Sequence, residues 1–401
     1  MFTLLIIVFV DLVGFGIIIP FLPFFAEHFE ASPDTVTLLI AVFAFFQFLF
    51  APYWGRLSDR IGRKPVLLMT LAGLCLSYVW LGLSESLPML FAARAFAGAC
   101  AGNIAVAQGY IADVTPPEHR AKALGRIGAA FGLGFLLGPA IGGLLAGPDP
   151  ANPNILPPAL AAAAMTLTAF LLALARLEES LGPEVRAKAK AAPRRGRAAM
   201  WIEVLRKPHL GILLMMLFLV PFTFSGIEST LAMWTERQFG WGARQNGWVY
   251  SYLGLIAVIT QGGLIGPLTR LLGERRLLLL APVAVGAGSA AVALTPGLAP
   301  PLAALGLVVF GISIANPTLN SLISQRAAST ERGMVLGVAQ STASLARIFG
   351  PAWAGFCFVA FGRDWPFLSG GLVMVVMAGL ALRLFFSLAT TGPGRSAPPG
   401  G

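Results

Sequence analysis

The sequence predicts an all-α polytopic membrane protein whose twelve transmembrane helices form two pseudo-symmetric six-helix bundles. Three observations carry this prediction: a composition that is 57% apolar and 11% charged, long apolar runs separated by short charged loops, and an internal repeat. A soluble domain has about 25% charged residues. About 20 apolar residues cross the ~30 Å of membrane hydrocarbon as a helix, so 401 residues provide about a dozen spans.

Twelve apolar runs are long enough to be membrane spans. The first begins at Phe2 without a basic leader and passes Pro20 without a small-residue cleavage site, which predicts a retained span instead of a signal peptide. In chain order, the predicted spans are residues 2–26, 34–54, 66–84, 88–112, 122–146, 155–175, 208–235, 245–266, 277–295, 299–325, 333–361 and 366–389.

The net charge of +10 follows the positive-inside rule. With the amino terminus in the cytoplasm, Lys and Arg gather in or beside cytoplasmic segments, except for Arg237, Arg244 and Arg363 outside and Arg94 and Arg347 within spans. The pattern predicts cytoplasmic termini and does not indicate nucleic-acid binding. The missing leader and the short loops indicate a bacterial cytoplasmic (inner) membrane.

Cysteines and loops exclude several kinds of site. Cys75, Cys100 and Cys357 lie in apolar runs without paired spacing, so neither a disulfide framework nor a metal site is predicted. No glycine-rich phosphate loop followed by Lys and Ser or Thr occurs, which argues against ATP as the energy source.

The longest polar segment divides the chain. Residues 176–207 carry nine Lys and Arg and predict a cytoplasmic linker over 177–207. This linker separates an amino-terminal bundle, 1–176, from a carboxy-terminal bundle, 208–390, and a flexible tail follows over 391–401.

The two halves share two sequence patterns. The pattern Arg-x4-Gly-x12-Gly-Pro-Ala-x-x-Gly of residues 120–143 recurs at an offset of 212 in residues 332–355. The pattern Gly-x-Leu-Ser-x-x-Ile-Gly of residues 55–62 recurs more faintly at an offset of 211 in residues 266–273, with Thr for Ser and Leu for Ile.

Four motifs carry a family resemblance. The loop Gly55–Pro65 reads G-R-L-S-D-R-I-G-R-K-P, and the first span has D-L-V-G-F-G-I-I-I-P from Asp11. The fourth span has R-A-F-A-G from Arg94, and the fifth has G-x-x-x-G-P-x-x-G-G from Gly134. By these motifs the chain resembles the major facilitator superfamily, and within it the twelve-span drug:proton antiporters, closest to tetracycline-resistance-type efflux pumps.

The resemblance implies a mode of action. Substrate is expected between the halves near the membrane midplane, the halves are expected to rock for alternating access, and a proton gradient is expected to drive export without a cofactor. A lipophilic small molecule is the implied substrate and a monomer the implied unit. Spans 66–84 and 277–295 contain no acid, and His28, His119 and His209 lie at loops or span ends, so the tetracycline–metal chemistry of those pumps does not carry over.

The loop Gly55–Pro65, here called the signature loop, predicts a conformational latch. Asp59 can accept hydrogen bonds from a helix amino terminus, and the resemblance names the span that starts near Gly333. The resemblance also implies that Arg63 pairs with Asp113. The alternative is a topology anchor whose cations stay in the cytosol. The latch set is Gly55, Asp59, Arg60, Gly62, Arg63, Lys64 and Asp113.

Four ionisable side chains lie well inside predicted spans: Asp11, Arg94, Glu228 and Arg347. A charge inside the membrane is costly unless it is paired or faces water, so each is a candidate for proton coupling. Burial favours the neutral form of a carboxyl group, so Asp11 or Glu228 could carry the proton. The alternatives are a packing acid at Asp11, a rim position for Glu228 and a structural ion pair between Arg347 and Glu228.

The glycines of the fifth span predict a close helix contact. Gly134, Gly138 and Gly142 are four residues apart and share one helix face. Pro139 removes a backbone donor and favours a kink. Together with Gly143 they resemble the antiporter motif, for which small-residue packing alone is a compatible interpretation.

Uncharged polar residues and phenylalanines predict the substrate cavity. Few polar anchors among aromatic side chains suit an amphiphilic drug better than a sugar. The predicted substrate-binding residues are Gln47, Asn103, Gln108, Gln261, Asn316, Asn320 and Gln340.

Two other functions compete with drug:proton antiport. The polar set would also suit an exporter or facilitator of a polar metabolite such as a sugar, for which both carboxylates would be dispensable. A receptor of the same fold that does not transport is the second alternative. A membrane enzyme is disfavoured, because no catalytic triad or metal cluster lies at a common depth.

Overall fold

The computed structural model describes residues 2–116, 119–147, 154–182, 197–207, 209–327 and 332–390, and the regular secondary structure in these ranges is helical. The amino-terminal half comprises α1 (Phe2–Ile18), α2 (Leu22–His28), α3 (Pro33–Ile61), α4 (Arg63–Gly82), α5 (Leu87–Cys100), α6 (Asn103–Val114), α7 (Arg120–Leu145) and α8 (Leu156–Arg176). After α10 (Arg197–Leu205), the carboxy-terminal half comprises α11 (Leu210–Phe239), α12 (Ala243–Ile259), the π-helix η2 (Thr260–Leu264), α13 (Ile265–Leu294), α14 (Ala299–Arg326), α15 (Arg332–Phe361) and α16 (Trp365–Thr390).

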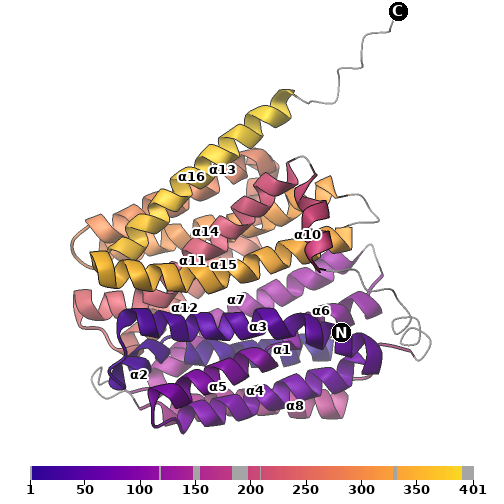
Figure 1. The fold of residues 1–401 in the computed structure, drawn as a ribbon, viewed down its shortest axis with the longest axis vertical. Coiled ribbons are helices and arrows are strands. Elements are labelled where there is room, and N and C mark those ends of the chain that lie inside the picture. The colour runs from indigo at the N-terminus through magenta and orange to yellow at the C-terminus, as the bar shows by residue number, and fades with distance from the viewer. Residues whose placement is uncertain are drawn as a thin grey trace, which may run out of the picture.

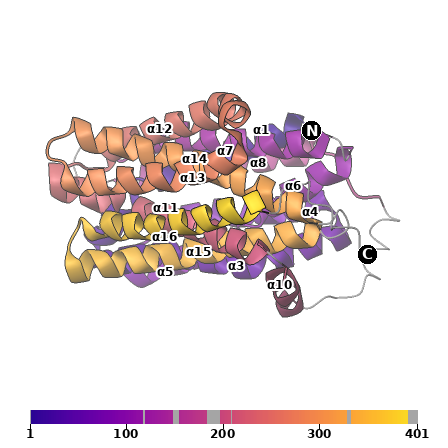
Figure 2. The ribbon, with the colours of Figure 1, turned by 90° about the horizontal axis from the view of Figure 1, so that it is seen from above.

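The two halves form two layers of helices that run side by side. Figure 1 shows most of the amino-terminal half in the lower part of the view and most of the carboxy-terminal half in the upper part, with α7 and α12 between them. In Figure 2 the amino terminus lies at the right, the end toward which α16 also runs. Residues 183–196 of the predicted linker fall outside the described residues, as do the first residue of the predicted carboxy-terminal bundle, 208, and the whole predicted tail 391–401.

Eleven stretches are long and apolar enough to cross a membrane, and one of them, Ala243–Leu294, has 52 residues. A straight helix of that length would measure about 78 Å, far more than one crossing of ~30 Å needs. The stretch bends at Gly273, whose φ of 73° and ψ of 157° are not helical. It therefore contains two spans, and the predicted all-α membrane fold is confirmed.

The sequence repeat at Gly62 and Gly273 corresponds to two matching turns. Gly62 has a φ of 115° and a ψ of 157° and alone separates α3 from α4. Both glycines have the positive φ that other residues rarely adopt. The loops predicted over 55–65 and 267–276 are therefore largely helical and turn at a single glycine.

Two predicted spans are broken helices. The first ends at Ile18 and resumes at Leu22, because Pro20 disfavours the helical conformation of the residue before it. The fourth breaks at Ala101 and Gly102. Two side chains of α3 satisfy carbonyl groups there: Trp54 Nε1 donates to Ala99 at 2.6 Å, and Gln47 Nε2 donates to Ala101 at 3.4 Å.

The halves pack against each other along two seams. Helix α7 packs on α1 within its own half and on α12 across the seam, and α15 likewise packs on α11 and on α3. At the end opposite the signature loop, Arg237 Nη2 of α11 lies 3.5 Å from Glu27 Oε1 of α2. A Cβ added at Gly355 of α15 would overlap the Thr37 side chain of α3. The halves are thus in contact at the end opposite the signature loop.

Candidate functional site

Asp11 lies in a buried polar cluster of the amino-terminal half. Its side chain, on α1, is 4% exposed. The amide Nδ2 of Asn103 donates a hydrogen bond to Asp11 Oδ2, and the hydroxyl of Thr166 donates one to Oδ1 at 3.3 Å. Asn103 is the first residue of α6, directly after the break at Gly102, so the broken helix begins again at the residue that contacts Asp11. The sequence placed Asn103 in the substrate cavity and did not identify Thr166.

Arg94 is the buried cation of the same half. It is 4% exposed, and its guanidinium carbon lies 4.5 Å from the centre of the Phe43 ring, which is a cation–π contact. Tyr78 lies close enough to interact electrostatically with both Arg94 and Asp11. Among the described residues, Arg94 Nε has no hydrogen-bond partner. The structure thus adds Tyr78 and Phe43 to the predicted pair of ionisable groups.

Glu228 and Arg347 form a second charged group in the carboxy-terminal half. Glu228 lies on α11 and Arg347 on α15, and the two interact electrostatically but form no ion pair within 4.0 Å. The Tyr250 hydroxyl donates to the backbone carbonyl of Glu228 at 2.8 Å. Arg347 Nη2 donates to Ser344 Oγ at 3.4 Å, and its Nε has no partner in the part of the chain that the structure describes.

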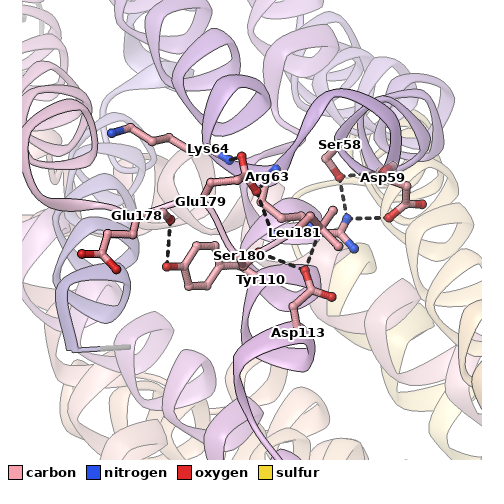
Figure 3. Close-up of polar contacts among 11 residues, drawn as sticks. Ser58, Asp59, Arg63, Lys64, Tyr110, Asp113, Glu178, Glu179, Ser180 and Leu181 are labelled. Carbon is pink, nitrogen blue, oxygen red and sulfur yellow. Dashed lines mark hydrogen bonds and ion pairs between the residues drawn. The ribbon is translucent and has the colours of Figure 1, made fainter. Parts of the chain in front are cut away.

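In the signature loop, Arg63 pairs with Asp113, as the resemblance implies, and also with Asp59, which was not predicted (Figure 3). The Arg63 guanidinium lies 2.7 Å from Asp59 Oδ1 and 2.9 Å from Asp113 Oδ2. It also donates to Ser58 Oγ at 2.6 Å, and Gly109 leaves room for it, because a Cβ there would lie 2.8 Å from Arg63 Cζ. The predicted hydrogen bonds to Asp59 from the amino terminus of the span near Gly333 are not tested by the described residues, so that contact stays a prediction.

The first residues of the predicted linker form hydrogen bonds with this loop and with Asp113. The carboxylate of Glu179 accepts hydrogen bonds from the backbone N–H groups of Arg63 at 2.8 Å and Lys64 at 3.2 Å. It therefore caps the start of α4, where the first N–H groups have no partner within the helix. Ser180 Oγ donates to Asp113 Oδ2 at 3.0 Å (Figure 3). The sequence analysis did not identify Glu179 or Ser180.

Replacing Glu179 by Gln is expected to lower the free energy of unfolding by about 1–3 kcal/mol, because hydrogen bonds to a charged acceptor are lost. Gln also turns an NH2 donor toward N–H groups that are themselves donors. Thermal unfolding in detergent measures the effect. Glu178→Gln is the matched control: it removes the same charge from an exposed neighbour whose backbone carbonyl, not its carboxylate, accepts from Tyr110. Equal stability of the two variants would contradict the cap.

The glycine motif of α7 has two faces. A Cβ added at Gly134 would lie 2.9 Å from Leu12 Cβ, and one at Gly138 would lie 2.7 Å from Gly16 Cα, so this face meets α1 together with Gly142. Gly143 faces the other half, where a Cβ would lie 2.8 Å from the carbonyl oxygen of Ala243. The carbonyl oxygen of Pro139 likewise faces Gly247 of α12. One face of the motif thus packs against α1 within the amino-terminal half, and another face packs against α12 of the carboxy-terminal half.

The other predicted cavity residues come from five helices, α3, α6, η2, α14 and α15. Gln47 contacts the break in the fourth span, and Asn320 Nδ2 of α14 donates to the carbonyl of Asn316 at 2.9 Å. Four of these side chains are exposed and one is half-buried. The exposed ones are Gln108, Gln261, Asn320 and Gln340, and the half-buried one is Asn316. Of the predicted set, only Asn103 has a hydrogen bond to one of the four membrane-embedded charges.

Comparison with known proteins assigns the family. The family model "Major Facilitator Superfamily" matches residues 4–351. The chain is 32% identical to "Tetracycline resistance protein, class E" of Escherichia coli, covering 98% of this chain and 96% of that protein. It is 30% identical to "Multidrug resistance protein 2" of Bacillus subtilis, covering 94% of this chain and 92% of that protein.

The fold also matches a solved transporter. A bacterial homolog of the human lysosomal transporter Spinster, in an inward-facing and occupied conformation, superposes with a TM-score of 0.77 at 17% identity, covering 98% of both chains. The resemblance that the motifs indicated is confirmed. The chain belongs to the Major Facilitator Superfamily and is a multi-pass membrane transporter, not an enzyme.

Proposed function

We propose that the protein exports hydrophobic or amphiphilic small molecules in exchange for protons. The observation that carries this proposal is the buried carboxyl group of Asp11, held by Asn103 and Thr166 beside Tyr78 and Arg94. Two relatives at about 30% identity are named for tetracycline and multidrug resistance, which supports a drug-like substrate.

Asp11 is suited to load and release a proton. Burial favours the neutral carboxylic acid, whereas the two hydrogen-bond donors favour the carboxylate. A change in either effect would therefore shift the balance between the protonated and the ionised form. The side chains of Asp11, Asn103 and Thr166 all belong to the amino-terminal half, so a shift of α1, α6 or α8 within that half would change this balance. Glu228, with Arg347 nearby, is a second candidate for the same role in the other half.

Alternating access is supported by contacts that join the halves at one end of the molecule. The Glu27–Arg237 pair and the packing of Thr37 on Gly355 join the halves at the end opposite the signature loop. We place the signature loop in the cytoplasm of a bacterial cell, with both termini on that side, because its cations follow the positive-inside rule. The contacts just described would then close the outer end of the molecule. Each chain holds both halves, so a monomer suffices.

An amphiphilic organic anion is a second candidate substrate. Arg94 Nε and Arg347 Nε are buried donors with no hydrogen-bond partner among the described residues, one in each half. Such donors are costly unless something binds to them, and a carboxylate or sulfonate would satisfy them.

The test uses the purified protein in proteoliposomes with an internal pH-sensitive dye and an imposed pH gradient. The compounds are lipophilic cations, tetracyclines, amphiphilic anions and polar sugars. Proton movement triggered by an amphiphile, and absent from protein-free liposomes, is the expected result. Sugar movement without protons, unchanged in Asp11→Asn and Glu228→Gln, would replace the proposal with a facilitator.

A further inference from the structure

A basic pocket lies at the turn of the carboxy-terminal half. Its volume is about 470 Å³, and it is bounded by the turn at Gly273, the end of α14 and the end of α16. Three arginines line it: Arg275 and Arg276 of α13 and Arg326 of α14. None of them belongs to the proton or substrate site described above.

The positive charge of this pocket is only partly balanced by the described part of the chain. Its acid, Glu274, accepts hydrogen bonds from Ser321 Oγ at 2.6 Å and Gln325 Nε2 at 2.9 Å. No carboxylate of the described residues lies within 4.0 Å of the three guanidinium groups. Arg326 is repelled by Arg275 and attracted by Glu274, and one carboxylate cannot balance three guanidinium groups, so an anion in the pocket would stabilise the arrangement.

The repeated turn of the amino-terminal half contains such an anion. There the helix restarts after Gly62, and the Glu179 carboxylate accepts its first N–H groups. The helix that restarts after Gly273 has the same glycine conformation, but Glu274 turns its carboxylate to α14. After Asp364 the sequence contains no Asp or Glu. No side chain that follows α16 can therefore accept hydrogen bonds at the second turn as the Glu179 carboxylate does at the first. Among the described residues, no carboxylate takes the place of Glu179 at the second turn.

The surroundings of the pocket indicate a lipid. Leu272, Leu322 and Phe385 line it beside the arginines, and the neighbouring side chains of Leu271 and Phe386 are 77% and 64% exposed. All three helices are membrane spans, so the apolar rim lies where acyl chains begin. We propose that this pocket binds the phosphodiester headgroup of an anionic phospholipid. Basic pockets between membrane helices recognise such headgroups through charge-assisted hydrogen bonds from arginine.

Lipid retention tests the site. The protein is purified in phosphatidylcholine nanodiscs with and without phosphatidylglycerol, and native mass spectrometry counts the lipids that stay bound after release. Wild type is expected to retain phosphatidylglycerol preferentially, and the double variant Arg275→Gln with Arg276→Gln is expected to bind it about tenfold more weakly. The matched control is Arg270→Gln with Arg383→Gln, which removes two exposed cations near the same turn that do not line the pocket.

The other outcomes decide against the proposal. Equal retention by the pocket variant and the control variant would overturn the site. Inorganic phosphate that raises the melting temperature of wild type, but not of the pocket variant, as much as phosphatidylglycerol does would assign the site to free phosphate instead. Melting temperatures in phosphatidylcholine alone show that both double variants are folded.

Discussion

Asp11→Asn is expected to reduce substrate-driven proton movement by about 100-fold or more, the scale of losing a positioned proton-transfer group. Asn has nearly the shape of Asp: its carbonyl oxygen can still accept from Asn103, and its NH2 group can donate to the Thr166 hydroxyl, so the packing of α1 is retained. It cannot release a proton, so the site stays in its neutral form. Binding of the substrate is therefore expected to persist while its coupling to the proton gradient is lost.

The measurement compares gradient-driven export with downhill exchange in the same proteoliposomes. Asp34→Asn is the matched control, because it makes the same chemical change in the first turn of α3, outside the buried cluster. It should transport like wild type. Glu228→Gln separates the two candidate acids: a loss there with normal coupling in Asp11→Asn would assign the proton to the carboxy-terminal half and remove the role proposed for Asp11.

The sequence predicts the spans well, because each helix must satisfy its backbone within itself and be apolar over the membrane thickness. The turns at Gly62 and Gly273 could be predicted as a pair, since the repeat conserves the one residue type that tolerates their positive φ. The break at Ala101 and Gly102 could not. It depends on hydrogen bonds from Gln47 and Trp54, which lie about fifty residues away in the chain and leave no periodic signal.

Some contacts of the candidate site could be predicted from the sequence and others could not. Arg63 and Asp113 could be paired from motifs that resemble the family, and the structure places them 2.9 Å apart. Glu179 caps a helix 116 residues earlier in the sequence, and nothing in the local pattern of the linker distinguishes it from Glu178. Asn103 was predicted as a substrate ligand because an isolated polar residue in a span does not indicate which neighbour it will face. The roles of these residues in transport remain predictions.

Gly138→Ala is expected to destabilise the protein by about 2–4 kcal/mol, although it adds a single methyl group. At Gly138 a Cβ would lie 2.7 Å from the Cα and the carbonyl carbon of Gly16 and 2.7 Å from the carbonyl oxygen of Val13. These are backbone atoms of α1 that cannot turn aside as a side chain can, so α1 and α7 must separate. Thermal unfolding and the yield of folded protein in detergent measure the result.

Gly128→Ala on the same helix is the control with the opposite expected sign. Nothing lies within 4 Å of a Cβ at Gly128, and Ala favours a helix over Gly by up to about 1 kcal/mol, so this variant should be as stable as wild type or more stable. If Gly138→Ala were equally stable, α1 and α7 could not pack as closely as the structure shows. Because Asp11 lies on α1 five residues before Gly16, the separation of α1 from α7 should also impair proton coupling in the Gly138→Ala protein that remains folded. A single helix contact would then connect the stability of the amino-terminal half to the geometry of its buried acid.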